Sequence, residues 1–239
     1  MIINFDFTFN VVTILIGILA WSVIGYLTYR TYQKQMEKPK VWKILIVLFI
    51  GLFSFSFNWS MFDTMIKIPI LPLGVWILYF AFKGKGERWQ IYRSFAWLGY
   101  LANFIFLLST LAVIPVHHAI YPENELSTYI TTVENASIIP IHPSAKDFTL
   151  NKEKLLEQLH KMKQEPIYSN QWYEETFMNA ESNNKMERFP FQLIGTSPKW
   201  GSGFQTIIYL EEDGKGILLS TQNKQLYFRS ENSLIKEGE

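Results

Sequence analysis

The chain of 239 residues contains no cysteine. Disulfide bridges, thiolate metal ligands and cysteine nucleophiles are therefore excluded. A domain outside the cytoplasm would have to be held together by its hydrophobic core alone, which about 120 residues can supply. Common catalytic signatures are also lacking, because the sequence has no HExxH, GxSxG, phosphate-loop or EF-hand pattern. These absences favour a function without catalysis.

Acidic residues are scarce in the first half of the chain. Residues 1–119 contain 10 Lys and Arg but 4 Asp and Glu, a net charge of +6, whereas residues 120–239 contain 12 and 17, a net charge of −5. An asymmetry of this size predicts two physical environments, here a membrane domain followed by a domain in water. The negative excess of the second half also argues against binding to nucleic acid.

Long apolar stretches fill the first half. Four of them predict membrane helices, over about 11–29, 44–62, 68–82 and 95–116. At 1.5 Å per residue, about 20 residues cross the roughly 30 Å of hydrocarbon in a bilayer. The third stretch is the shortest, and its prolines, Pro69 and Pro72, fall in the first turns, where a helix tolerates them. The predicted fold class is a four-helix transmembrane α bundle over residues 1–119, followed by a small extracytoplasmic α+β domain.

The basic residues of the first half form two clusters that orient this bundle. The clusters are Arg30, Lys34, Lys38, Lys40 and Lys43, and then Lys83, Lys85, Arg88 and Arg93. Cytoplasmic loops carry the excess of Lys and Arg, so both clusters are predicted inside and both termini outside. If the third stretch did not cross, the second cluster would lie outside, against the rule at a short loop. The sequence therefore predicts a multi-pass plasma-membrane protein with four crossings.

The second half is predicted to be an extracytoplasmic linker over residues 120–146 and an α+β domain over residues 147–239. Asn151 precedes an apolar stripe and is predicted to cap a helix. A second short helix is expected over 171–180. From Arg188 onward the apolar residues alternate in four segments, and an Asp-Gly turn at 213–214 separates two of them. We expect an antiparallel meander of four strands with two helices on one face.

Two histidines at the membrane exit are candidate metal ligands. His117 and His118, together with Glu123 and Asp63, could hold Zn²⁺ at the outer membrane interface or act as a pH-sensitive latch. Adjacent histidines on a helix point about 100° apart, so the helix would have to end there for both to bind one ion. The simpler interpretation is that these are ordinary residues at a helix end, and no other cofactor is expected.

Polar residues at membrane depth are few. Ser54, Asn58 and Asn103 could form a polar seam that binds a ligand, or they could simply hydrogen-bond between helices. No ionisable residue lies between the basic clusters and the outer turn. Ion transport and proton relay need such groups, so a small transporter subunit is the least favoured function.

The favoured function is that of a non-enzymatic bacterial plasma-membrane protein. Its bundle would anchor an extracytoplasmic domain that binds a partner or ligand. The two predicted cytoplasmic loops are about a dozen residues each, too short for an output domain, so the chain would be accessory or regulatory to another membrane protein. The predicted partners are the lipid bilayer and that protein. The alternative from another class is a membrane enzyme with a metal site at the outer interface.

Overall fold

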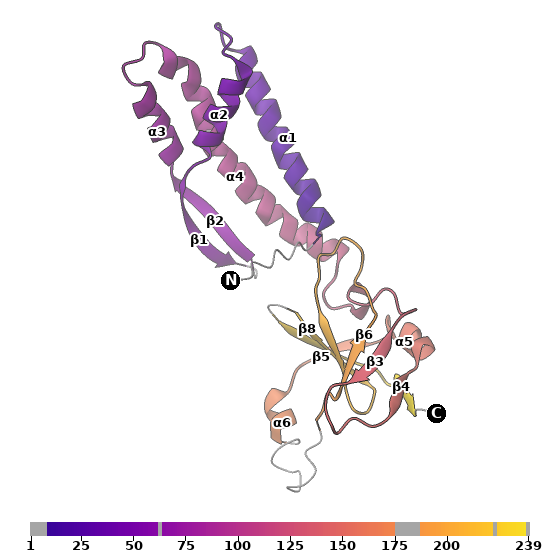
Figure 1. Ribbon diagram of the computed structural model, residues 1–239. Coiled ribbons are helices and arrows are strands. Elements are labelled where there is room, and N and C mark those ends of the chain that lie inside the picture. The colour runs from indigo at the N-terminus through magenta and orange to yellow at the C-terminus, as the bar shows by residue number, and fades with distance from the viewer. Residues whose placement is uncertain (1–8, 62–63, 175–186, 222–223, 238–239) are drawn as a thin grey trace. The chain divides into compact units, whose positions relative to one another are not determined.

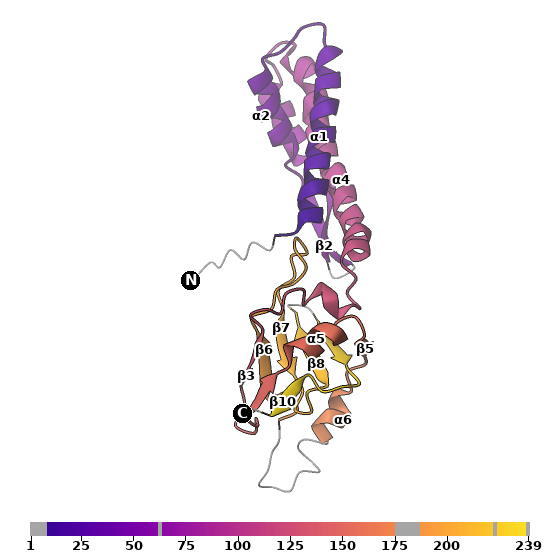
Figure 2. The same ribbon diagram turned by 90° about the vertical axis from the view of Figure 1, so that its right-hand side faces the viewer.

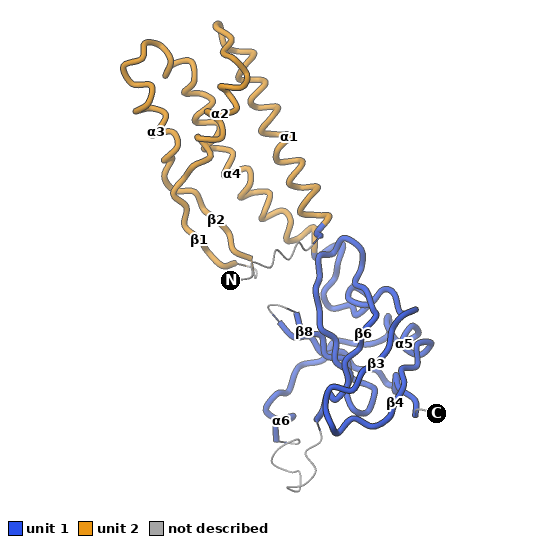
Figure 3. Tube along the Cα trace, in the orientation of Figure 1, with its two compact units in different colours: residues 1–10, 118–239 blue, residues 11–117 orange. Residues whose placement is uncertain are grey.

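The computed structural model describes residues 9–61, 64–174, 187–221 and 224–237. The chain divides into two compact units, one formed by Val11–His117 and the other by Met1–Asn10 with His118–Glu239 (Figure 3). The short N-terminal segment therefore belongs to the same unit as the C-terminal half. We refer to Val11–His117 as the helical unit and to the other as the sheet unit.

The helical unit combines two long helices with two helix–strand segments. Its elements are α1 (Val11–Gln33), α2 (Val41–Gly51), β1 (Phe55–Met61), β2 (Thr64–Leu71), α3 (Leu73–Phe82) and α4 (Arg88–Ile120), the last of which continues into the sheet unit. Strands β1 and β2 form an antiparallel hairpin that continues the line of α2 and α3 alongside α4 (Figure 1). The chain thus passes along this unit four times, but its two middle passes are half helix and half strand.

The prediction of a four-helix transmembrane bundle is wrong. Among the described residues, α1 and α4 are the two helices whose length and composition would allow them to cross a membrane, since α2 and α3 have 11 and 10 residues. The stretch predicted as a helix over 44–62 is α2 followed by β1, and the stretch over 68–82 is the end of β2 followed by α3. The described residues also include a substantial sheet.

The physical reason is a change of period within each apolar stretch. Residues 55–61 read FSFNWSM, a strict alternation of apolar and polar side chains that fits the two-residue repeat of a strand. Pro69 lies in β2, and Pro72 directly precedes α3, where the missing N–H of proline costs no helical hydrogen bond. Average hydrophobicity over a window does not detect either change.

Close backbone contacts join α2, α3 and α4 at the level where the strands begin. A Cβ added at Gly51, Gly74 or Gly99 would overlap backbone atoms of Ala96, Ile50 or Leu48, respectively. Around this point, buried side chains from α2, α3 and α4 form the core of the unit, among them Val47, Val75 and Phe95. The glycines are therefore required for the spacing of these three helices.

The sheet unit is built around six antiparallel strands in the order β3-β6-β7-β8-β9-β5 (Figure 2). Its strands are β3 (Ser137–Pro140), β4 (Phe148–Leu150), β5 (Lys163–Glu165), β6 (Phe191–Ile194), β7 (Ile207–Leu210), β8 (Gly216–Ser220), β9 (Gln225–Arg229) and β10 (Ile235–Glu237). A short 3₁₀ turn, η1 (Leu126–Thr128), and two helices, α5 (Lys152–Gln158) and α6 (Ser169–Tyr173), accompany them. Strands β4 and β10 form a separate antiparallel pair. Neighbouring strands β6 to β9 follow one another along the chain.

The core of the sheet unit includes residues from the segment predicted as a linker. Within 120–146, the buried apolar residues Leu126, Tyr129, Ile130, Val133 and Ala136 belong to the same apolar cluster as the sheet. This segment also supplies β3, the edge strand beside β6. Its apolar side chains are thus part of the folded unit.

The two helices of this unit lie close to where the sequence predicts them. The Asn151 side chain accepts a hydrogen bond of 3.1 Å from the Lys154 N–H and so caps α5. Helix α6 occupies the first part of the second predicted helix, and residues 175–180 of that prediction lie outside the described residues.

Candidate functional site

An open groove of about 500 Å³ lies at the turn between β7 and β8, beside the β4–β10 pair. Its lining consists of Lys146, Phe148, Glu212, Asp213, Ser233, Ile235, Lys236 and Glu237. Lys146 Nζ donates a hydrogen bond of 3.1 Å to Glu212 Oε1 across the lining. The groove thus carries charges of both signs beside the apolar side chains of Phe148 and Ile235.

The turn beside the groove is defined by its sequence. Gly214 has a φ of 69°, a conformation that glycine adopts without strain. The Lys215 N–H donates a hydrogen bond of 2.8 Å to Asp213 Oδ1, and the Leu234 N–H donates one of 2.7 Å to the Gly214 carbonyl. The turn is therefore tied to the segment that leads into β10.

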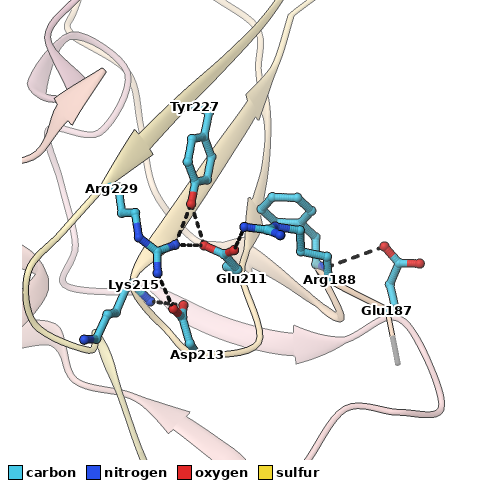
Figure 4. Close-up of polar contacts among 8 residues, drawn as sticks. Glu187, Arg188, Glu211, Asp213, Lys215, Tyr227 and Arg229 are labelled. Carbon is cyan, nitrogen blue, oxygen red and sulfur yellow. Dashed lines mark hydrogen bonds and ion pairs between the residues drawn. The ribbon is translucent and has the colours of Figure 1, made fainter. Parts of the chain in front are cut away.

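A buried carboxylate lies next to this turn and braces it (Figure 4). Glu211, which is 5% exposed, accepts hydrogen bonds from three donors. Tyr227 Oη is 2.6 Å from Glu211 Oε2, Arg229 Nη1 is 2.5 Å from the same oxygen, and Arg188 Nη2 is 2.7 Å from Oε1. Asp213 Oδ2 accepts a hydrogen bond of 2.7 Å from Arg229 Nη2. We call this network of Glu211, Arg188, Tyr227, Arg229 and Asp213 the Glu211 brace. Asp213 also lines the groove.

The sheet register brings these residues together. Glu211 directly follows β7, and Arg229 is the last residue of β9, where it is paired with Gly216 of β8. Gly216 has no side chain, and a Cβ there would overlap Glu211 Oε2 and crowd the Tyr227 hydroxyl. The glycine therefore leaves the space that the carboxylate occupies.

Aromatic rings pack against Arg188 and Tyr227. The Arg188 guanidinium lies 4.5 Å from the centre of the Trp172 ring, and that ring packs edge-on against Tyr227 at 5.0 Å and Phe189 at 5.5 Å. A guanidinium over an indole face is a favourable cation–π arrangement. These contacts join α6 to the sheet.

The environment of the brace changes two acid–base equilibria. Burial and the hydrogen bond to Glu211 raise the pKa of Tyr227 to about 12. Burial disfavours the charged form of Arg229, but the hydrogen bond with Tyr227 and the charges of Glu211 and Asp213 outweigh it and raise the pKa of Arg229. With its oxygens engaged by three donors, Glu211 holds two strands and the segment before β6 together.

The predicted metal ligands are only partly brought together. His117 and His118 lie near the C-terminal end of α4, and His118 Nε2 is 3.7 Å from Glu123 Oε1. The other oxygen of Glu123 pairs with Lys224, and Asp63 lies outside the described residues. In the described part of the chain, no three His, Asp or Glu residues are grouped so that they could hold a metal ion.

Of the three residues of the predicted polar seam, Asn103 is the one whose side chain is described as bonding to backbone. Asn103 Nδ2 donates to the carbonyl of Leu52, at 3.1 Å, where α2 ends and the chain turns toward β1. Ser54 Oγ lies 3.2 Å from Ser56 Oγ, and Asn58 is paired with Lys67 across the hairpin. Asn103 thus joins α4 to the end of α2, whereas Ser54 directly precedes β1 and Asn58 lies within it.

Sequence reasoning did not find the Glu211 brace. One local signal was present, since a glutamate directly follows the apolar run IIYL, but Arg188 is far from it along the chain. The pairing follows from the strand register.

Comparison with protein-family models, curated proteins and solved structures finds no match to this chain.

Proposed function

We propose that the helical unit is embedded in the bacterial plasma membrane and presents the sheet unit as a binding module outside the cytoplasm. The observation that carries this proposal is the exposure of large apolar side chains on α1 and α4. In the most apolar part of each helix, 17% of the residues are buried, and Leu15, Leu19 and Leu108 are each at least 60% exposed. A helix from the core of a soluble protein would be mostly buried, whereas lipid favours this surface.

The charges supply an orientation. The α1–α2 and α3–α4 connections lie at the same end of the helical unit and carry the two basic clusters (Figure 1). The rule that cytoplasmic loops are basic places this end inside, and the start of α1 and the end of α4 outside. In this proposal α1 and α4 are the membrane crossings, and both termini are extracytoplasmic.

The hairpin supports a protein partner within the membrane plane. Tyr100 Oη donates to the Ile70 carbonyl at 3.1 Å, so the base of the hairpin lies about 18 Å along α4 from Arg88, near the middle of a bilayer. Among the described residues β1 has one strand neighbour, β2. A strand edge facing lipid leaves polar backbone groups without partners, which costs several kcal/mol per group. We propose that another membrane protein covers this edge.

The binding role of the sheet unit rests on the groove beside the Asp213–Gly214 turn. Its mixed charges suit an extended polar segment of a partner protein, and the Glu211 brace holds its wall rigid. A rigid site loses less conformational entropy on binding than a flexible one. The chain would then act as an accessory protein, with the groove outside and the hairpin edge in the membrane as its two contacts.

The orientation can be tested in whole cells because the chain has no cysteine. Single substitutions Lys85→Cys and Glu231→Cys introduce thiols at exposed positions on the two proposed sides. A maleimide that does not cross membranes should label position 231 in intact cells and position 85 only after lysis. Labelling of position 85 in intact cells, or extraction of the chain from membranes by alkaline carbonate, would contradict the proposal.

The partner can be tested by photo-crosslinking in the membrane. A photoreactive residue at Phe57, which is 54% exposed on β1, should crosslink to one defined protein. The same residue at Leu19, 65% exposed on α1, should react with lipid and serves as the control. Recovery of the Phe57 adduct as lipid alone would contradict a covered hairpin edge, and a dimer of this chain would identify a second copy as the partner.

A further inference from the structure

A cluster of exposed apolar and aromatic side chains lies on the sheet unit at the points where the chain enters α1 and leaves α4. We call it the Trp200 patch; its exposed members are Phe9, Ile120, Lys199 and Trp200, and the buried Tyr121 contacts them. Trp200 is 76% exposed, Phe9 54% and Ile120 45%. The rings of Phe9 and Trp200 lie 5.6 Å apart, although about 190 residues separate them along the chain. Such a surface is unusual on a domain surrounded by water.

The loop that carries Trp200 is held by hydrogen bonds on both sides. The Thr131 N–H donates to the Ser197 carbonyl at 2.8 Å, the Lys199 N–H to the Thr128 carbonyl at 3.0 Å, and the Ser202 N–H to the Lys199 carbonyl at 3.1 Å. Because the loop is anchored in this way, Trp200 is presented at the surface by defined backbone structure.

The same loop is tied to both chain segments that lead to the long helices. Asn10 forms an isolated antiparallel bridge with Ser202 just before α1 begins. At the other segment, Tyr121 Oη donates to the Trp200 carbonyl and Lys199 Nζ donates to the Ile120 carbonyl, each at 3.0 Å. The patch therefore adjoins the ends of both helices by chain connectivity alone.

We infer that the Trp200 patch is a membrane anchor of the sheet unit that inserts into the outer lipid–water interface. Tryptophan prefers this zone because its ring is apolar and carries one polar group. Phe9 adds apolar area, and the Lys199 ammonium, 5.6 Å from the centre of the Tyr121 ring, provides positive charge for lipid phosphates. The inference depends on the proposed membrane insertion of α1 and α4, which places their ends at that interface.

The absence of cysteine allows a direct test on the full-length protein. The variants Trp200→Cys and Glu231→Cys are labelled with an environment-sensitive fluorophore and reconstituted into phosphatidylethanolamine–phosphatidylglycerol vesicles. The label at position 200 should be quenched by lipids that carry a spin label near the headgroup and protected from aqueous iodide. The label at the exposed control position 231 should behave in the opposite way.

A second measurement avoids the label. In vesicles of brominated lipid, the native tryptophan emission should be quenched more strongly in the unsubstituted protein than in Trp200→Ser, because one lipid-exposed indole is lost. Equal access of iodide to positions 200 and 231 would overturn the inference. A label shielded from both iodide and spin-labelled lipid would also overturn it, since protein would then cover the patch. Failure of the chain to remain in carbonate-washed membranes would instead refute the membrane proposal itself.

Discussion

Gly216 and Glu211 face each other across the start of β8, so close that a Cβ at position 216 would overlap the glutamate carboxylate. The missing side chain and the buried charge are therefore two parts of one feature. Arg188 and Arg229 bind the carboxylate from its two sides, and Asp213 extends the network to the wall of the groove.

Gly216→Ala should destabilise the sheet unit. The added methyl group must displace the Glu211 carboxylate or the Tyr227 hydroxyl, and overpacking of this kind costs about 1–3 kcal/mol. Gly25→Ala is the matched control, because a Cβ at that position meets no atom within 4 Å. Thermal unfolding of the full-length protein in detergent, followed by tryptophan fluorescence, measures both. Equal midpoints for the two variants would show that the carboxylate does not need this space.

Glu211→Ala should be more damaging than Gly216→Ala. Removing one member of a buried ion pair leaves the remaining charges without a partner and costs about 3–5 kcal/mol. The control is Glu157→Ala, which breaks the exposed ion pair with Lys161 and should change stability little. The free energy of unfolding from denaturant titration is the measurement. A loss at position 211 no larger than at position 157 would contradict a structural role for the brace.

Gly99→Ala should separate α4 from α2. A Cβ at Gly99 would overlap the Leu48 carbonyl and press on Gly51, so the helices must move apart, at a cost of about 1–3 kcal/mol. Gly17→Ala places a methyl group in open space on α1 and should leave the helical unit at least as stable, because alanine favours helix over glycine by about 1 kcal/mol. Unfolding midpoints in detergent should fall for Gly99→Ala alone.

Stability should decrease at alkaline pH between about 10 and 12. The pKa of Tyr227 is near 10 in an unfolded chain and about 12 in the fold, so the hydroxyl stays protonated longer when folded. The contribution of the raised Tyr227 pKa to the free energy of unfolding is complete below pH 10 and is lost as the pH rises through 12. Burial also raises the pKa of Tyr129, which adds to the effect. Unfolding measured across this range should show a shallower decline in Tyr227→Phe, and an unchanged slope would contradict the raised pKa of Tyr227.

Several features of the fold follow from local patterns. The apolar runs over 11–29 and 95–116 lie within α1 and α4, and Asn151 caps α5, because helix length and capping depend on neighbouring residues. The alternation over 55–61 was equally local, but it lay inside a run apolar enough to resemble a membrane helix. The prediction of a helix there was wrong because average hydrophobicity was given more weight than the two-residue alternation.

The candidate site could be predicted far less well. His118 and Glu123 are close in sequence and in space. Asn103, by contrast, contacts the carbonyl of Leu52, a residue far from it along the chain. The Glu211 brace draws residues from positions 188 to 229. Such pairings depend on strand register, and a shift by one residue would turn each side chain to the other face.

The sequence by itself determined the excluded chemistries, the division of charge between the halves and the basic residues around the helix ends, because composition and charge do not depend on folding. Only the tertiary structure decided that the two middle passes are half strand, that Glu211 lies between two arginines, and that Phe9 meets Trp200. The physical reason is that these features require contacts between distant segments, whose geometry is set by packing and register rather than by the residues next to them.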